Sequence, residues 1–324
     1  MRTVSLPGRP RRGLTLRQQE ARAGLALLSP TLVVVLAVVV GPVLWTTLLA
    51  FERLRLRNIR RTGIFDAEYT LQNFKTVLAS SGFLEALRTT VVYSVVGTAL
   101  AIGLGLAAAL VVRSPFRGRT LVRASMLLPY ISPIVAVAFV WQIMLSPELG
   151  IVNAIGTDVL GWDDKIPFLT ERSGELNLLG IHLGVPTALL MVIVFQAWRY
   201  FPFAFLFILA RLQALPAELD DAARVDGATP LQRFWYITLP QLQGVIALLA
   251  VLRFIWTFNE FDDIFLLTGG GAGTEVLSVR VYHYLTARGD VGASAATSLV
   301  MAAILAVVLV VYFRFFVGRP EEAT

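Results

Sequence analysis

Long apolar runs without charged residues dominate the pattern along this chain. Crossing about 30 Å of hydrocarbon takes about 20 apolar residues in a helix. Four runs of about this length carry no charge: 31–50, 89–112, 124–145 and 291–313. Two more runs, on either side of the 210–243 loop, are each interrupted by one arginine, Arg199 and Arg253. The pattern predicts six membrane-spanning helices.

The charges between these runs predict the orientation, because short cytoplasmic loops carry an excess of Lys and Arg. The 113–123 loop has four arginines and no acid, whereas 147–183 has two basic residues and six acids. This asymmetry places both termini and the 210–243 loop in the cytoplasm. It also accounts for the net charge of +6, so we expect no nucleic-acid partner. Five arginines at 53–61 contradict the trend, and contact with a partner is the one role we assign to them.

The chain divides into three segments. Residues 1–24 form a basic cytoplasmic segment, and 25–318 form the six-helix transmembrane domain with a long cytoplasmic loop at 211–243. Residues 319–324 form a cytoplasmic tail. The first span is longer than the 7–15-residue apolar region of a signal peptide, so we expect it to be retained.

Composition narrows the possible chemistry. Hydrophobic residues make up 56% of the 324 residues and charged residues 15%, which is typical of a membrane protein. There is no cysteine for a disulfide, a thiolate metal site or a nucleophile, and His182 and His283 are too isolated to predict a metal site. Neither lysine follows a phosphate-binding glycine-rich loop, so any ATP must bind to another chain. No catalytic residue is predicted.

The 210–243 loop contains start and stop signals for two short helices. Pro216 suits a first helical turn, and the three acids that follow it place negative charge at the positive end of the helix dipole. Gly227 predicts the end of this helix, because glycine tolerates a left-handed backbone. Thr229 and Pro230 supply an N-cap and a first-turn proline for the second helix.

This loop resembles the E-A-A motif of binding-protein-dependent ABC importer permeases, in which E-A-A, three residues, G and nine residues precede I-x-L-P. The matching positions are Asp221, Ala222, Ala223, Gly227, Ile237, Leu239 and Pro240. The spacing is matched throughout, and Asp in place of Glu keeps the charge. The paired alanines leave one helix side nearly bare, so the helix can enter another protein's groove closely. The resemblance implies that 211–243 is a coupling loop that docks on an ATPase subunit.

The resemblance covers about 25–318 and is greatest to sugar importers of the maltose and glycerol-phosphate permease type. Further similar segments lie at 127–133, 198–203 and 261–271. Ala272 stands where the family usually has a proline, and no large extra domain interrupts the external loops. The resemblance implies an all-α integral membrane protein with the type I ABC importer permease fold.

The resemblance also implies the partners. They are a second homologous permease, two ATP-binding subunits and an extracytoplasmic solute-binding protein, assembled in the lipid of the bacterial cytoplasmic (inner) membrane. ATP and Mg would be bound by the ATPase subunits. This chain would therefore bind no cofactor and act as a non-catalytic transport subunit.

Polar residues inside the predicted spans are the second set of candidates, because charges at membrane depth usually face a bundle interior or a water-filled path. Helical spacing places three on one face of the fourth span and three on one face of the fifth. The set is Gln196, Arg199 and Tyr200, then Arg253, Thr257 and Glu260, with Tyr130 on the third span. These positions match those that line the sugar site of maltose-type permeases. The resemblance implies a substrate pathway in which tyrosines stack on a sugar and the other groups bond its hydroxyls.

A structural role for the same charges stays open, because buried charges persist mainly when they are paired. Arg199 or Arg253 would then pair with an acid at 260–263. Asn259, Asp262 and Asp263 lie near the external end, where we expect a solvated rim. The glycine-rich 269–273 segment predicts an external turn, and the prolines on either side of Tyr130 predict a broken helix.

Two other functions stay open. The arginines of the pathway permit an anionic solute such as a glycerol-phosphate ester in place of a neutral sugar. A self-sufficient secondary transporter or channel would use the buried charges as an ion relay, but it gives the E-A-A segment no role.

Overall fold

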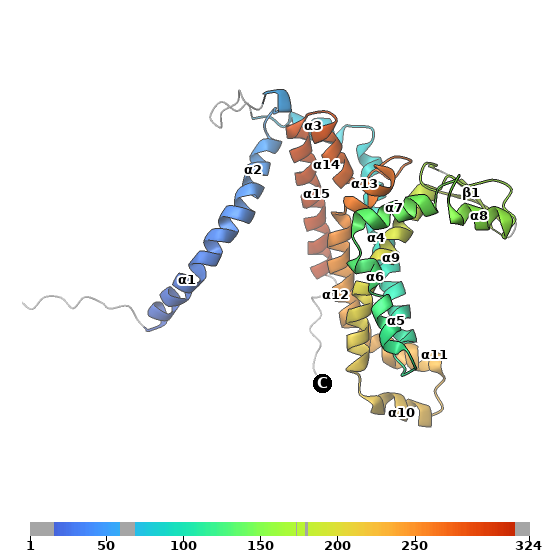
Figure 1. Cartoon of the computed structure of the whole chain (residues 1–324). Coiled ribbons are helices and arrows are strands. Elements are labelled where there is room, and N and C mark those ends of the chain that lie inside the picture. Colours follow the sequence, from blue (N-terminus) through green and yellow to red (C-terminus); the bar gives the residue numbers. More distant parts are fainter. Residues whose placement is uncertain (1–15, 59–68, 173, 179–180, 315–324) are drawn as a thin grey trace, which may run out of the picture.

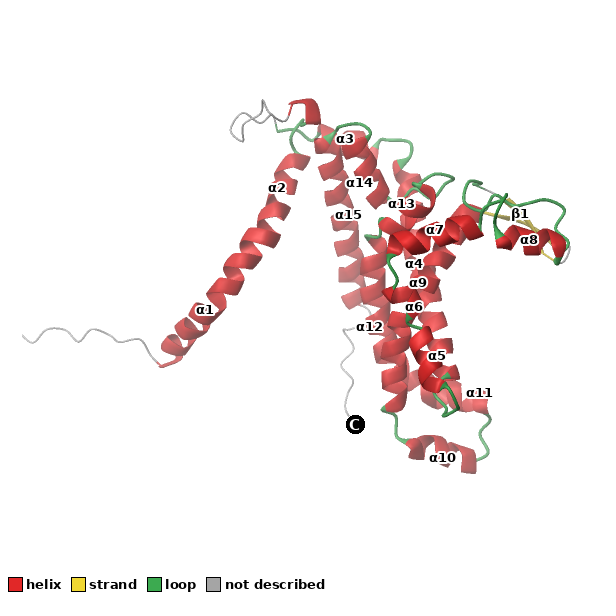
Figure 2. Ribbon diagram, viewed as in Figure 1, coloured by secondary structure: helices red, strands yellow, loops and turns green. Residues whose placement is uncertain are grey.

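The computed structural model describes residues 16–58, 69–172, 174–178 and 181–314. Most of the predicted N-terminal segment, Arg60 and Arg61 of the 53–61 arginine cluster, and the 319–324 tail lie outside these residues. Helices form most of the described chain, and its strands are confined to one short hairpin (Figure 2). The predicted all-α class is confirmed, with this hairpin as an unpredicted addition.

Five helices of the described chain are long and apolar enough to cross a membrane. The first, Glu20–Ala50, runs through α1 (Leu16–Val35), a π-helical turn (η1, Leu36–Val40) and α2 (Gly41–Ala50). Three others are the single helices α4 (Phe83–Val111), α9 (Thr187–Gln213) and α15 (Val291–Tyr312). The remaining one, Pro230–Phe258, joins α11 (Pro230–Arg233), a π-helical turn (η3, Phe234–Thr238) and α12 (Leu239–Phe258). They correspond to predicted spans one, two, four, five and six.

The predicted third span is broken. It consists of α5 (Arg119–Ser125), α6 (Leu128–Ile131) and α7 (Ile134–Met144). The stretch before the break and α7 meet at 95°. Ser132 is extended (ψ 142°), because the ring of Pro133 disfavours a helical conformation at the preceding residue. The break predicted beside Tyr130 is confirmed.

Small residues bring α4 and α9 into close contact at the centre of the bundle. A methyl group at Gly105 would lie 2.7 Å from Cβ of Ala204 and 2.8 Å from the backbone nitrogen of Phe205. One at Gly97 would lie 2.5 Å from the amide oxygen of Gln196. Glycine therefore allows the helix axes to approach, as is usual between helices in membranes. This contact fixes the position of the polar residues on α9.

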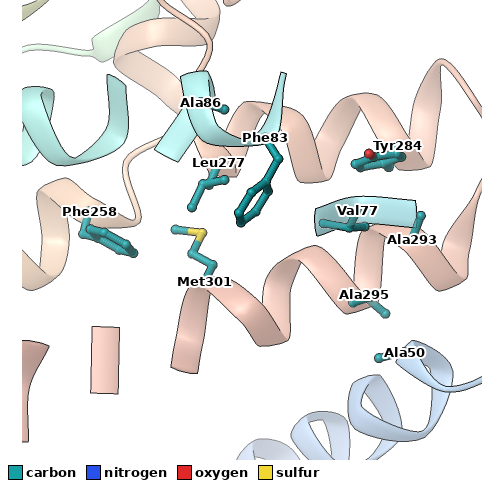
Figure 3. Packing of buried hydrophobic residues seen from close by; sticks show 11 residues of the cluster. Ala50, Val77, Phe83, Ala86, Phe258, Leu277, Tyr284, Ala293, Ala295 and Met301 are labelled. Carbon is teal, nitrogen blue, oxygen red and sulfur yellow. The ribbon is translucent and has the colours of Figure 1, made fainter. Parts of the chain in front are cut away.

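A cluster of buried apolar side chains closes one end of the bundle, where α3 (Gln72–Leu78) and α14 (Leu277–Thr286) cover α4 and α15. Figure 3 shows Phe83 of α4 beside Leu277 of α14, with Met301 of α15 reaching toward them. Ala50, the last residue of α2, is fully buried in the same cluster. The first span is attached to the rest of the molecule at this end.

Away from this attachment, α1 diverges from the other spans (Figure 1). None of the residues in the most apolar stretch of the first span, Glu20–Ala50, is buried. Val33 and Val38 are each more than 60% exposed. Such a surface is unfavourable in water but suits lipid or a neighbouring apolar helix.

A small appendage extends sideways beyond α7 (Figure 1). It contains α8 (Ile151–Asp158) and an antiparallel hairpin of β1 (Gly174–Leu178) and β2 (Ile181–Val185), in which Gly174 lies opposite Val185. The buried amide of Asn153 donates to the carbonyl of Ile166 at 3.0 Å and accepts from its backbone nitrogen at 2.7 Å. These bonds hold the loop around Ile166 against α8.

The described part of the arginine-rich 53–61 loop contains a 3₁₀ turn (η2, Leu56–Asn58). Leu56 donates its backbone N–H to the carbonyl of Gly289 at 2.8 Å, and Gly292 donates to the carbonyl of Leu54 at 3.1 Å. Arg53, Arg55 and Arg57 remain exposed. The loop is held by its backbone, so its cationic side chains face outward.

Candidate functional site

A group of polar side chains lies buried between α9, α12 and the short helix α13 (Asp262–Thr268). Thr257 is at its centre. The hydroxyl oxygen of Thr257 accepts from Nε2 of Gln196 and from Nη2 of Arg253, each at 3.1 Å. All three residues are at most 2% exposed. Helical spacing predicted that Arg253 and Thr257 share one face of α12, and tertiary packing added Gln196.

An ion pair lies beside this group. Nη1 of Arg199 is 3.2 Å from Oδ1 of Asp263, and the carboxylate side chain is fully buried. The hydroxyl of Tyr93 on α4 donates to Oδ2 of the same carboxylate at 3.3 Å. The structural alternative, in which Arg199 or Arg253 pairs with an acid at 260–263, therefore holds for Arg199.

The expectation of a solvated rim is wrong for Asp263 and correct for its neighbours. Asp262 and Asn259 are exposed. Asp263 is one position further into α13, and the helical turn directs it inward to Arg199 and Tyr93. Sequence reasoning missed Tyr93, although a lone tyrosine in an otherwise small and aliphatic stretch of the second span was a usable signal.

Tyr200 links the buried group to Glu260 and to the more exposed Tyr130. Its hydroxyl donates to Oε2 of Glu260 at 3.1 Å. The guanidinium carbon of Arg253 lies 3.9 Å from the centre of its ring, which is a cation–π contact. The ring of Tyr130 lies edge-on to the ring of Tyr200 with the ring centres 6.2 Å apart, and Tyr130 is 41% exposed. The structure therefore brings all seven predicted pathway residues into one cluster.

The charges in this cluster balance, with Arg199 and Arg253 against Glu260 and Asp263. Among the described residues, no carboxylate lies within ion-pair distance of Arg253. Three buried polar atoms also lack hydrogen-bond partners within the described chain, namely Oε1 of Gln196 and Nε of both arginines. The formal charges of the cluster therefore sum to zero, and the three unpartnered atoms are enclosed by the packed helices.

The predicted coupling helix is present as α10 (Ala217–Val225). Figure 1 shows it at the far end of the molecule from α3 and α14. Gly227 ends it with φ +79°, and the backbone N–H of Ala228 donates to the carbonyl of Ala223 at 2.9 Å, which closes the last turn. Asp221 and Ala222 are exposed, as are Leu219 and Val225. The helix therefore presents a small and partly apolar face.

The second predicted helix begins as expected but does not end in the loop. Thr229 and Gln232 form a reciprocal capping box, with Thr229 N–H donating to Oε1 of Gln232 at 2.8 Å and Gln232 N–H donating to Oγ1 of Thr229 at 3.3 Å. The helix then continues through η3 into α12. The I-x-L-P part of the motif, Ile237 to Pro240, thus lies at the start of a span. Pro240 near the start of α12 leaves the chain helical, because η3 shifts the hydrogen-bonding pattern before it.

The glycine-rich 269–273 segment forms the predicted turn, with positive φ at Gly269, Gly270 and Gly273. Ala272 also has a positive φ of 50°. The φ of a proline is locked near −65°, so a proline could not adopt the conformation of Ala272. The alanine that replaces the family's usual proline is therefore compatible with this backbone.

Comparison with known proteins places the chain. Residues 101–318 match the family described as "Binding-protein-dependent transport system inner membrane component". The inner membrane ABC transporter permease protein YcjO of Escherichia coli is 34% identical over 286 residues, which cover 88% of this chain and 91% of YcjO. The trehalose/maltose transport system permease protein MalF of Thermococcus litoralis is 32% identical, covering 94% of this chain and 96% of MalF. The sn-glycerol-3-phosphate transport system permease protein UgpA of Rhizobium meliloti is 33% identical, covering 76% of this chain and 80% of UgpA.

Among solved structures, a bacterial ABC transporter involved in import of the acidic polysaccharide alginate contains a chain of similar fold. The TM-score is 0.73 at 22% identity, covering 91% of this chain and 95% of the other. The fold agrees with that of this solved chain over most of both lengths. From the family match and the relatives, this chain belongs to the family of binding-protein-dependent transport system inner membrane components.

Proposed function

We propose that this chain is the permease subunit of an ATP-driven ABC importer for a neutral sugar or related polyol. It pairs with a second homologous permease to enclose an alternating-access pathway. An extracytoplasmic binding protein delivers the solute, and two ATPase subunits bind ATP and Mg on the cytoplasmic side. Both termini are cytoplasmic, and this chain performs no chemistry.

The observation that carries this proposal is α10. It is a short helix at the end of the bundle, with an exposed Asp221-Ala222 pair and a left-handed Gly227 directly after it. Small side chains permit close docking and lose little rotamer entropy. A self-sufficient transporter or channel would leave this helix without a role.

A continuous helix links α10 to the polar cluster. Asp220 of α10 accepts from Nη1 of Arg233 at 2.9 Å, and Arg233 lies on the helix that runs unbroken from Pro230 to Phe258. Arg253 and Thr257 are on the last turns of that helix. A displacement of α10 by the ATPases would therefore be transmitted to the solute pathway along this continuous helix, which rises about 1.5 Å per residue.

The balanced charges of the cluster support a neutral solute. Arg199 is paired with Asp263, and Arg253 lies against the ring of Tyr200, while the formal charges of Glu260 and Asp263 offset those of the two guanidinium groups. Tyr130 and Tyr200 supply ring faces for a sugar, and the unpartnered oxygen and nitrogens, which are buried in this conformation, supply hydroxyl contacts once the pathway opens. The sugar in the name of the MalF relative agrees with this solute, whereas the UgpA relatives keep glycerol phosphate as the second candidate.

The test is affinity purification from native membranes of the tagged chain and of its Gly227→Asp variant. A side chain at Gly227 has open space, since nothing lies within 4 Å of its Cβ position, but it must adopt a strained positive φ at the docking helix. We expect wild type to bring down an ATPase and a second permease, and the variant to lose the ATPase while remaining inserted. The matched control is Gly161→Asp, which has the same open space and a φ of +71° but lies in the appendage.

Normal recovery of the ATPase with Gly227→Asp, or equal loss with Gly161→Asp, would contradict the assignment of α10. Recovery of the folded chain alone, from membranes in which a known importer survives intact, would favour the self-sufficient transporter.

A further inference from the structure

A cavity of about 690 Å³ lies between the end of α4 and the loop that carries α10. Its charged lining consists of Arg113 from the chain just after α4, Asp220 and Arg224 from α10, and Arg233 from α11. Leu110 and Phe234 contribute apolar walls. Neither the polar cluster nor the docking face of α10 uses this cavity.

Positive charge exceeds negative charge in this cavity. Asp220 is its one acid, and it already accepts from Arg224 at 3.0 Å and from Arg233 at 2.9 Å. No ion pair to Arg113 is formed by any residue in the described ranges, and Nε of Arg233 is buried without a hydrogen-bond partner. The lining therefore has about two unneutralised charges and free guanidinium donors, a combination that favours an oxyanion.

The position of the cavity favours a lipid. The apolar part of α4 ends at Val111, so Arg113 lies at the level where hydrocarbon gives way to headgroups. Leu231 on the cavity wall and Leu121 on the neighbouring helix are both exposed, at 67% and 75%. A phosphodiester among the arginines with acyl chains along these leucines satisfies both kinds of lining, as basic pockets at the ends of membrane helices do.

We propose that this cavity binds the phosphate headgroup of an anionic phospholipid from the cytoplasmic leaflet. The side of the membrane rests on the proposed orientation, and the site itself does not require the ATPase partner. A bound headgroup bridges Arg113 on the bundle to Arg224 on α10. The lipid therefore holds the coupling helix in place, where the Asp220 ion pair would otherwise be its main side-chain link to the bundle.

The test uses the purified full chain in neutral detergent, titrated with phosphatidylglycerol and followed by native mass spectrometry. We expect retained phosphatidylglycerol adducts, and an apparent affinity that falls at least fivefold in Arg113→Gln and in Arg224→Gln. Arg117→Gln is the matched control, because Arg117 is exposed on the same loop but does not line the cavity. Size-exclusion profiles identify variants that fail to fold. If one of the two arginine variants fails to fold, the other still tests the site.

Equal binding of phosphatidylcholine, or an equal loss in Arg117→Gln, would overturn the proposal, because each indicates unspecific lipid contact. Competition by millimolar inorganic phosphate with no preference for the lipid would overturn the lipid as the occupant. Recovery of the ATPase is measured on the same variants in native membranes. Lost lipid with weaker ATPase recovery supports the site and its link to α10, whereas lost lipid with unchanged ATPase recovery would overturn the role of the lipid in holding α10. Failure of ATPase recovery in wild type refutes the proposed function without affecting the lipid result.

Discussion

At the scale of single residues, two glycines on one helix have opposite roles. Gly105 faces Ala204 and the backbone of Phe205, whereas nothing lies within 4 Å of a Cβ placed at Gly103. Both lie within α4, so their intrinsic helix propensities are equal and only their neighbours differ. The comparison isolates the contribution of close packing between α4 and α9.

We expect Gly105→Ala to lower the free energy of unfolding by about 1–3 kcal/mol, because a backbone atom blocks the new methyl group. Gly103→Ala should raise it by up to about 1 kcal/mol through helix propensity. Thermal unfolding in detergent measures both. Equal effects at the two positions would show that α4 and α9 do not approach as described.

The buried ion pair gives a second prediction at this scale. Removing one partner leaves an uncompensated charge, so we expect Asp263→Leu to destabilise the chain by about 3–5 kcal/mol. Combining it with Arg199→Leu should restore part of this loss, because both charges are then absent. A double-mutant cycle on thermal stability measures the coupling. Strictly additive effects would mean that the two side chains do not interact.

At the scale of elements, the capping box decides where the helix after α10 begins. We expect Thr229→Ala to cost about 1 kcal/mol, because the first turn loses the side-chain acceptor for Gln232 N–H. Hydrogen exchange of the backbone amides around Gln232 should then be about fivefold faster, while Thr229→Ser should exchange like wild type. Unchanged exchange in the alanine variant would show that packing alone fixes this helix start.

The same scale explains why the predicted third span is not straight. Composition predicted a 20-residue apolar helix, and Pro133 predicted a break, but neither gave the direction of α7. That direction is fixed by a distant element, since Nε2 of Gln142 on α7 donates to the carbonyl of Leu266 at 2.7 Å at the end of α13. Hydropathy cannot record a contact between residues so far apart in the chain.

At the scale of the whole molecule, the absence of cysteine permits a clean test of orientation. Val225 on α10 is 88% exposed and Leu149 before α8 is 82% exposed, and they lie toward opposite ends of the bundle. We expect a membrane-impermeant maleimide to label Leu149→Cys in intact cells and Val225→Cys only after the membrane is opened. Labelling of both in intact cells, or the reverse order, would contradict the predicted orientation.

The sequence alone determined the features that depend on neighbouring residues. Apolar run length set the number and approximate positions of the spans, since about 20 residues must cover the hydrocarbon. Gly227, Thr229 and Pro230 set the ends of the short helices, because caps and left-handed turns are local. Helical spacing also placed Arg253 with Thr257 and predicted that the pathway residues share faces.

Tertiary structure alone decided how these faces meet. The pairing of Arg199 with Asp263, the contribution of Tyr93 and the contact of Gln196 with Thr257 join residues more than sixty positions apart. The continuation of α11 into α12, the 95° bend before α7 and the arginine-lined cavity beside α10 arise in the same way. Local patterns specify which side chains are directed toward a common face, and only the packed helices specify which partner each side chain finds there.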